Sequence, residues 1–302
     1  MTFSDVEKAR EAYHKKTQKG WRYTAIATII AAALGCIFFP VTGLFSIIPV
    51  CFFAFFALII GIIIIALTTR EEAEAYRKSY KSYFVEQNLR KTFTDLTYDH
   101  QKGLDKSLLR QTGMVNTGDA YVSNDLTVAR YRTTKFIQAD ATIQEAHTDS
   151  DGNTTYTIIF RGRFMFFEFP KKFDYKLELI GKKFYSYLIP KKDAKTGRKM
   201  QKISTESTDF NRNFKIYGQD GFESFYLLDP AMIDKIDRLA ARYGYKVLLG
   251  FIDNTLLVAL DDGKDSFEPP KANKPIDESA ELAKINTDIR VITDFVDEII
   301  AH

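Results

Sequence analysis

The segment FRGRFMFFEFPKKF, residues Phe160–Phe173, is central to the fold, because it puts six phenylalanines and four basic residues into the length of one strand and a turn. Basic residues between aromatic ones are typical of a nucleic-acid-binding sheet, and equally of a strand whose alternate side chains are buried. Alternation predicts two faces, with Phe160, Gly162, Phe164 and Phe166 on one and Arg161, Arg163, Met165, Phe167 and Phe169 on the other. We therefore predict a core strand that Pro170 ends, with Gly162 at a bulge or a close backbone approach.

The nucleic-acid interpretation fails in detail. The strand of an RNA-recognition domain needs a basic residue before a glycine and a small residue between two aromatic ones. With Phe164, Phe166 and Phe169 in the aromatic places, Gly162-Arg163 and Met165 occupy those positions instead. We expect no nucleic acid as a partner.

Two uncharged apolar runs precede this segment, over residues 23–39 and 47–67. They are about 17 and about 21 residues long, close to the roughly 20 that a helix needs to cross a bilayer. A signal peptide does not fit, because a charged segment precedes the first run and a second run follows it. A buried core hairpin does not fit either, because the second run lacks polar positions. The sequence predicts a transmembrane hairpin.

The flanking charges predict the orientation of this hairpin. Six basic residues precede the first run and four follow the second, whereas the connecting loop has none. Cationic flanks stay on the cytoplasmic side, so we expect a multi-pass protein of the cell membrane with both termini in the cytoplasm. Cys36 and Cys51 lie one in each run and suggest packing or lipid-facing roles.

The predicted fold class is α+β, in which a mainly antiparallel β domain with packed helices follows the hairpin and its helical cytoplasmic extensions. The expected segments are an amphipathic cytoplasmic helix (1–22), the transmembrane hairpin (23–67), a helical stalk (68–94), an α+β soluble domain (95–268), and a linker with a C-terminal amphipathic helix (269–302).

Turn and capping signals define several elements of the soluble domain. Asp151-Gly152 between two alternating runs predicts a β-hairpin. Asp229 before Pro230 predicts the start of a helix, which Gly244 ends. Two strands, Lys246 to Ile252 and Thr255 to Leu260, are expected to form a hairpin around a tight turn. The apolar face of the closing helix is predicted to hold Leu282, Ile285, Ile289, Ile292, Phe295, Val296 and Ile299.

The chain resembles the bacterial family called domain of unknown function 3137. The resemblance rests on Phe160, Gly162 and Phe164, on the FPKKF that follows, and on the helix start LLDPAMIDKI. It is expected to cover the chain from about residue 70 onward. It implies a membrane-associated bacterial protein and supplies no catalytic residues.

Catalytic signatures are missing from the sequence. The four histidines are scattered, and no nucleophile motif, phosphate-binding loop or dinucleotide fingerprint occurs. We predict no catalytic residues, no metal site and no cofactor. The alternative, a membrane-tethered enzyme acting on a lipid or envelope substrate, would have to use Asp99, His100, Asp119 and Asp125 as its first candidates.

Positive charge is concentrated between Arg161 and Lys202, where 13 basic residues face four acidic ones in a chain of net charge +3. A basic hairpin tethered at a membrane attracts anionic headgroups; a solvated hairpin tip is the simpler alternative. The predicted function is a membrane-anchored cytoplasmic binding or scaffold module, with the bilayer, an anionic lipid or a protein as partner. The predicted contact residues are Lys171, Lys172, Lys182, Lys183, Lys191, Lys192, Lys195, Arg198 and Lys199.

Overall fold

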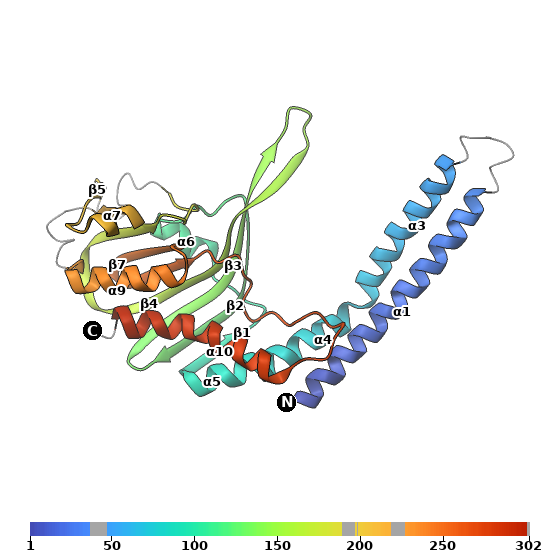
Figure 1. Ribbon diagram of the computed structural model, residues 1–302, viewed down its shortest axis with the longest axis horizontal. Coiled ribbons are helices and arrows are strands. Elements are labelled where there is room, and N and C mark those ends of the chain that lie inside the picture. Colours follow the sequence, from blue (N-terminus) through green and yellow to red (C-terminus); the bar gives the residue numbers. More distant parts are fainter. Residues whose placement is uncertain (37–46, 189–196, 198, 219–226, 301–302) are drawn as a thin grey trace. The chain divides into compact units, whose positions relative to one another are not determined.

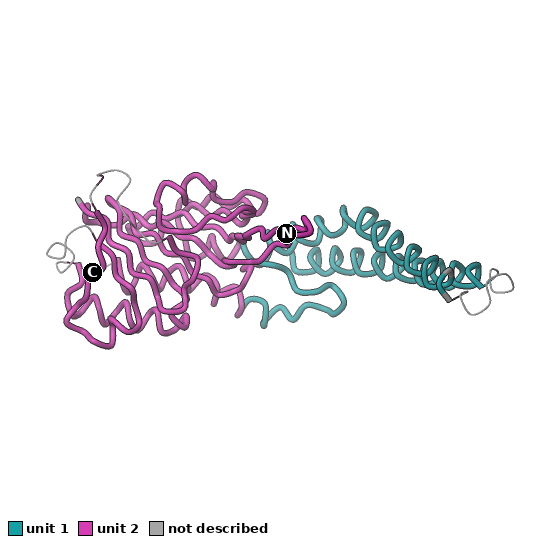
Figure 2. The backbone as a smooth tube through the Cα atoms, turned by 90° about the horizontal axis from the view of Figure 1, so that it is seen from above, with its two compact units in different colours: residues 1–85, 268–282 teal, residues 86–267, 283–302 magenta. Residues whose placement is uncertain are grey.

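The computed structural model describes residues 1–36, 47–188, 197, 199–218 and 227–300. Two compact units are present, and each is built from two stretches of the chain (Figure 2). The first unit comprises residues 1–85 and 268–282, and the second comprises residues 86–267 and 283–302.

The first unit is built on helices, namely α1 (Phe3–Cys36), α3 (Ile47–Thr68), α4 (Arg70–Tyr80) and the π-helical turn η2 (Lys81–Glu86). The helices α1 and α3 lie side by side (Figure 1). A side chain at Gly35 would place its Cβ 2.6 Å from the Cα of Val50, so glycine permits the close approach of the two helices. Nearer the chain start, α1 packs against α4, where Lys16 Nζ lies 2.5 Å from Glu72 Oε1.

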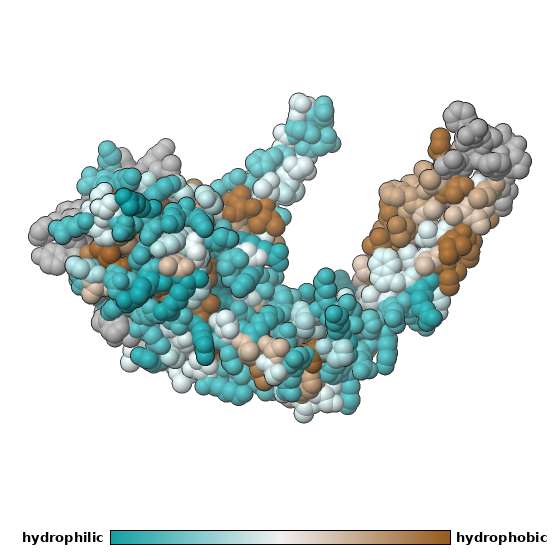
Figure 3. Space-filling model, in the orientation of Figure 1, coloured by the Kyte–Doolittle hydropathy of each residue, from teal (hydrophilic) through white to brown (hydrophobic). Residues whose placement is uncertain are grey.

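One helix among the described residues is long and apolar enough to cross a membrane, and it covers Val50–Thr68 in α3. Only 11% of that stretch is buried, so its apolar side chains face outward (Figure 3). The predicted first span, 23–39, is not confirmed as a second membrane helix. Its residues 23–36 belong to α1, which begins with a long polar stretch, and residues 37–39 lie outside the described residues.

The second unit contains a seven-stranded antiparallel sheet, which confirms the α+β class. Its strands are β1 (Thr94–Asp99), β2 (Ala120–Tyr131), β3 (Thr134–Thr148), β4 (Thr154–Gly181), β5 (Gln201–Ile203), β6 (Phe214–Gly218) and β7 (Val247–Leu260). The strand order is β1-β2-β3-β4-β6-β5, and β7 pairs with β4. The hairpin between β3 and β4 turns at Asp149–Asn153 as predicted, and it projects from the sheet (Figure 1).

The strand β4 does not end at Pro170, which corrects the prediction. It continues to Gly181, and its register with β7 shifts between Glu168 and Phe173. Pro170 lies inside this irregular stretch, where a residue without an N–H does not interrupt a regular hydrogen-bond ladder. The expected basic hairpin after Pro170 is therefore wrong as far as Gly181, because Lys171 and Lys172 belong to the middle of a strand.

The hairpin predicted within Lys246–Leu260 is also wrong, since β7 is one bent strand. Asp253 adopts a left-handed φ of +50° at the bend, and it pairs with Phe173 of β4. A tight turn would reverse the chain here, but β4 continues alongside and supplies hydrogen-bond partners on both sides of the bend. Pairing with this long neighbour thus overrides the local turn signal.

Helices cover the sheet on its two faces. The remaining helices are α5 (Gln87–Thr92), α6 (Lys106–Thr112), α7 (Thr208–Asn213), α9 (Pro230–Arg242), α10 (Glu278–Phe295) and η3 (Val296–Ile300). Leu109 of α6 packs with Phe160 and Phe164 on one face. On the other, the ring of Phe295 in α10 lies 6.4 Å from that of Phe167. The start of α9 is as predicted, because the Asp229 side chain accepts a hydrogen bond of 2.7 Å from the Met232 amide.

The predicted alternation of β4 is confirmed, but both of its faces are covered. Phe160 and Phe164 stack on one face with ring centroids 4.4 Å apart. Arg163 points to the other face and is only 2% exposed. A side chain at Gly162 would collide with the carbonyl oxygen of Leu260, so the predicted close backbone approach is real.

Candidate functional site

A row of apolar side chains crosses four neighbouring strands on the α6 face of the sheet. The register pairs Val128 of β2 with Ile137 of β3, Ile137 with Phe166 of β4, and Phe166 with Leu257 of β7. Paired residues of an antiparallel sheet point to the same face, so these four side chains form one line. Leu257 is buried, Ile137 and Phe166 are half-buried, and Val128 is 38% exposed.

This row borders a cavity of about 410 Å³, which we call the sheet pocket. Its lining residues are Asp95, Val128, Ala129, Arg130, Lys135, Phe136, Ile137, Phe166, Phe167, Glu168, Asn254 and Thr255. The volume lies in the range of small-molecule sites, and the half-covered apolar floor resembles the lining of such sites. The pocket can take up an apolar group without further opening.

The rim of the sheet pocket is charged. One step along the strands from the apolar row, on the same face, lie Arg130 and Lys135, which pair in the register. The guanidinium of Arg130 lies 3.2 Å from a carboxylate oxygen of Asp95, whereas Lys135 and Glu168 are exposed. The face thus changes from a buried core under α6, through half-buried apolar side chains, to a charged edge. This gradient suits an amphiphilic ligand.

The opposite face of the sheet carries a buried ion pair. Arg163 Nε donates to Asp140 Oδ1 at 3.2 Å, and Arg163 Nη1 donates to the Asp288 carbonyl at 2.7 Å. The guanidinium also lies over the ring of Phe267, 5.1 Å from its centroid. Burial raises the pKa of Asp140 to about 7, because the loss of hydration outweighs the attraction of Arg163. The neighbouring carboxylates of Asp125 and Asp265 also raise this pKa. The Asp140 carboxyl, with a pKa of about 7, therefore takes up its proton near neutral pH.

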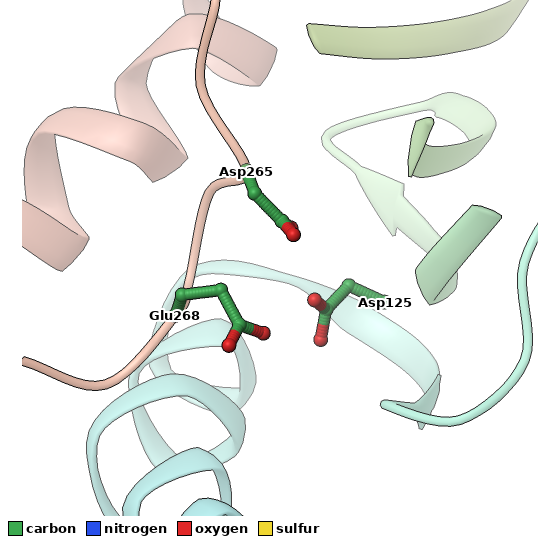
Figure 4. Close-up of side chains that lie close together, drawn as sticks. All are labelled: Asp125, Asp265 and Glu268. Carbon is green, nitrogen blue, oxygen red and sulfur yellow. The ribbon is translucent and has the colours of Figure 1, made fainter. Parts of the chain in front are cut away.

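Asp125 and Asp265 lie close to this pair, with carboxylate oxygens within 4.8 Å of one another (Figure 4). The amide of Asn124 donates to both carboxylates, at 2.8 Å and 3.2 Å. Asp125 also accepts a hydrogen bond from the Tyr98 hydroxyl. Both carboxylates thus accept hydrogen bonds from protein donors, so we do not propose that Asp125 and Asp265 hold a metal.

The predicted lysines are not brought together in the described part of the chain. Lys171 and Lys172 lie in the irregular stretch of β4, whereas Lys182 and Lys183 follow its end, at most about 33 Å further along from Lys172 to Lys182 at 3.3 Å per residue. Lys199 precedes β5 and is exposed. The other predicted contacts, Lys191, Lys192, Lys195 and Arg198, lie outside the described residues.

Lys182 has a structural role in the turn after β4. Its ammonium group donates to Asn213 Oδ1 at 2.7 Å and lies 4.4 Å from the centroid of the Tyr245 ring. The neighbouring Lys183 is exposed, and its backbone amide donates to the Tyr245 carbonyl. Of the two, Lys183 has the side chain better placed to meet an external partner.

Of the residues considered for catalysis, Asp99 and His100 lie at the end of β1, where Asp99 pairs with Leu126 next to Asp125, whereas Asp119 lies apart. Asp99 accepts the backbone amides of Gln101 and Lys102, which lowers its pKa. Asp119 accepts a hydrogen bond from the backbone amide of Ala146. It lies at the start of β2, about 20 Å along that strand from Asp125. Asp99 and Asp119 thus each accept hydrogen bonds from backbone amides, and Asp119 does not join the other candidates in one cleft.

The sheet pocket was not predicted from the sequence. Alternation placed Phe166 on the same face as Phe160 and Phe164, but the segment contains no sign that α6 would cover those two and leave Phe166 half-buried. Val128 and Ile137 belong to other strands, and only the register brings them beside Phe166.

Residues 158–300 match the family model described as "Protein of unknown function (DUF3137)". This match confirms the resemblance that Phe160, Gly162, Phe164 and the LLDPAMIDKI segment predict. The match starts at residue 158, whereas the resemblance was expected to begin at about residue 70. Phe166 therefore lies inside the matched segment, whereas Val128 and Ile137 precede it.

No curated protein matches the chain. A solved structure that matches is the mycobacterial trehalose monomycolate transport factor A, TtfA, at 11% sequence identity. The alignment covers 74% of this chain and 95% of that chain, with a TM-score of 0.38. At this score the likeness carries no argument about fold or function.

Proposed function

We propose that this chain is a membrane-anchored binding module that holds the apolar part of an amphiphile, such as a lipid acyl chain, in the sheet pocket. The observation that carries the anchoring is the exposure of α3, whose Val50–Thr68 stretch is only 11% buried. An exposed apolar helix of this length is stable in a bilayer and costly in water.

The partner helix α1 supports a two-span anchor with both termini in the cytoplasm. Ile26, Ile29, Ile30 and Leu34 of α1 are more than half exposed, although this part of the helix packs along α3. Outward apolar side chains on both helices of one unit favour a common lipid environment (Figure 3). The basic residues before residue 23 and after residue 69 favour the cytoplasmic orientation.

The half-buried row of the sheet pocket supports the ligand class. Val128, Ile137 and Phe166 offer an apolar floor, and the rim carries two basic and two acidic side chains, among which Lys135 and Glu168 are exposed and Arg130 pairs with Asp95. An acyl chain would remove the floor from water, at about 25 cal/mol per Å² of apolar surface. The polar head would then lie beside the charged rim.

Photocrosslinking of the full chain in lipid nanodiscs tests this function. A diazirine-bearing fatty acid should label peptides that contain Val128, Ile137 or Phe166. Val128→Asp should abolish that labelling, whereas Val122→Asp, on the same strand and 67% exposed, should preserve it. Labelling confined to α1 and α3 would contradict the pocket assignment, and loss of the chain from membranes after an alkaline wash would contradict the anchoring.

The predicted lysines form a second part of the proposal, in which exposed members of the set contact anionic headgroups. Lys183 and Lys199 are exposed and carry the charge that such headgroups attract. In full-chain proteoliposomes, acetylation of these two lysines should be slower with anionic than with zwitterionic lipid, and that of Lys235 on α9 should not change. Equal rates for all three lysines in both bilayers would refute this contact.

A further inference from the structure

A second cavity, of about 430 Å³, lies within the first unit between α1, α4 and the segment 268–273. We call the segment 268–277 the strap and this cavity the strap pocket. Tyr13, His14 and Thr17 line it from α1, Ala73, Tyr76 and Arg77 from α4, and Glu268–Asn273 from the strap. All of these residues belong to one compact unit.

The strap is held in place by hydrogen bonds to both helices. Arg10 Nη1 donates to the Ala272 carbonyl at 2.7 Å, and the Tyr76 hydroxyl donates to the Pro270 carbonyl at 3.0 Å. The amide of Ile276 donates to Glu7 Oε1 at 2.9 Å. Because these contacts use the ends of buried or half-buried side chains, the walls of the strap pocket are formed before any ligand binds.

The charge on the walls of the strap pocket is positive. Glu268 is the acidic member of the lining, and its carboxylate lies 2.7 Å from the ammonium group of Lys81 and 3.6 Å from Arg77. Lys81 is almost fully buried and is not among the lining residues, so it compensates the charge of Glu268 from outside the lining. Lys271 is exposed on the lining, Arg77 is exposed there and also pairs with Glu74 at 3.0 Å, and His14 adds a ring nitrogen. Such a lining complements an anion.

The strap pocket lies near the predicted membrane surface. Arg77 follows the end of the apolar stretch at Thr68 by nine residues, which is at most about 13 Å along a helix. The headgroup layer extends about 5–7 Å beyond the hydrocarbon core. The long side chains of Arg77 and Lys271 can bridge the remaining distance, since such side chains reach toward interfaces with their charged ends.

We propose that the strap pocket binds the phosphate group of an anionic membrane phospholipid. This inference rests on the membrane anchoring proposed above. The positive lining supplies attraction for the phosphate, the aromatic wall of Tyr13 and Tyr76 packs against the glycerol end of the lipid, and the closeness to the bilayer favours a lipid over a freely diffusing anion.

Native mass spectrometry of the full chain in detergent tests the proposal with dihexanoyl phosphatidic acid, a soluble lipid that carries the phosphate group. One bound lipid per chain is expected. Lys271→Glu should lower its affinity at least about fivefold, the effect of about one basic residue at a membrane surface. Lys274→Glu, three residues further along the strap and outside this pocket, makes the same charge change and should leave the affinity within twofold of the natural chain.

A second matched pair lies on α4. Arg77→Gln is the test variant, and Lys78→Gln is its control, since Lys78 does not line the strap pocket. Equal losses within both pairs would show general attraction and overturn the proposal, as would no loss in any variant. If inorganic phosphate displaces the lipid at equal concentration, the occupant of the strap pocket is a free anion and not a lipid. Because the soluble lipid needs no bilayer, these outcomes are separate from the alkaline-wash test of anchoring and from labelling of the sheet pocket.

Discussion

The guanidinium of Arg163 on β4 and the carboxylate of Asp140 on β3 form an ion pair of 3.2 Å between paired residues of neighbouring strands, and both side chains are almost fully buried. Burial removes both charges from water, so loss of either partner leaves the other charge buried and uncompensated. Arg163 also donates to the Asp288 carbonyl of α10, which joins the sheet to the helix that covers it.

Arg163→Met should destabilise the fold by about 3–5 kcal/mol at pH 8, because it leaves the Asp140 carboxylate buried without its partner. The measurement is the thermal unfolding of the full chain in detergent. Arg161→Met, two residues away on the same face of the strand but exposed, is the control and should change the free energy of unfolding by less than about 0.5 kcal/mol. If the two variants unfold alike, the pair does not stabilise the fold.

Asp140 should make stability depend on pH in a defined window. Its pKa rises from 3.8 to about 7 on folding, so the folded state holds the proton more tightly than the unfolded state. This contribution is complete below about pH 4 and is lost as the pH rises through 7, at up to about 1.4 kcal/mol per pH unit. Asp140→Asn should remove this part of the slope, as measured by chemical unfolding from pH 4 to pH 8. An unchanged slope in the variant would contradict the assignment to Asp140.

Gly162→Ala should cost about 2–3 kcal/mol of stability, because its methyl group would meet the carbonyl oxygen of Leu260 on the paired strand β7. The carbonyl oxygen is a backbone atom, which cannot move aside as the end of a flexible side chain can. Thr157→Ala, on an exposed part of β4, serves as the comparison and should have little effect. A melting temperature for Gly162→Ala equal to that of the natural chain would show that the strands can separate at this point.

Ile60→Arg should weaken membrane insertion of α3, since an arginine at the centre of a span costs about 2.5–3.5 kcal/mol. Leu67→Arg, near the end of the same stretch, should be tolerated because its side chain can reach the interface. The fraction of chain that stays with membranes after an alkaline wash measures both. Full retention of Ile60→Arg would mean that α3 does not cross the bilayer.

Some predictions succeeded because their cause is local. The alternation of β4 follows from the two-residue repeat of a strand, and the start of α9 follows from the Asp229 side chain and Pro230. The buried stripe of the closing helix is also as predicted from Ile285 to Ile299. Each of these features depends on residues within a few positions of one another.

Other predictions failed where a distant strand competed with a local signal. Asp253 and Asn254 read as a hairpin turn, but β4 runs alongside and keeps β7 extended through a bend. Pro170 read as a strand end, but the same pairing resumes at Phe173. The sequence contains both signals, and only the pairing of β4 with β7 shows that the long-range contact prevails.

The sequence by itself determined the apolar helix, the antiparallel α+β character and the two faces of β4, because these depend on hydropathy and on residue periodicity. The tertiary structure alone decided that Arg163 meets Asp140, that Val128, Ile137 and Phe166 form a half-open row, and that the strap closes a pocket on α1 and α4. These arrangements depend on strand register and on packing between residues far apart in the chain, and register is set by all paired residues together rather than by any one segment.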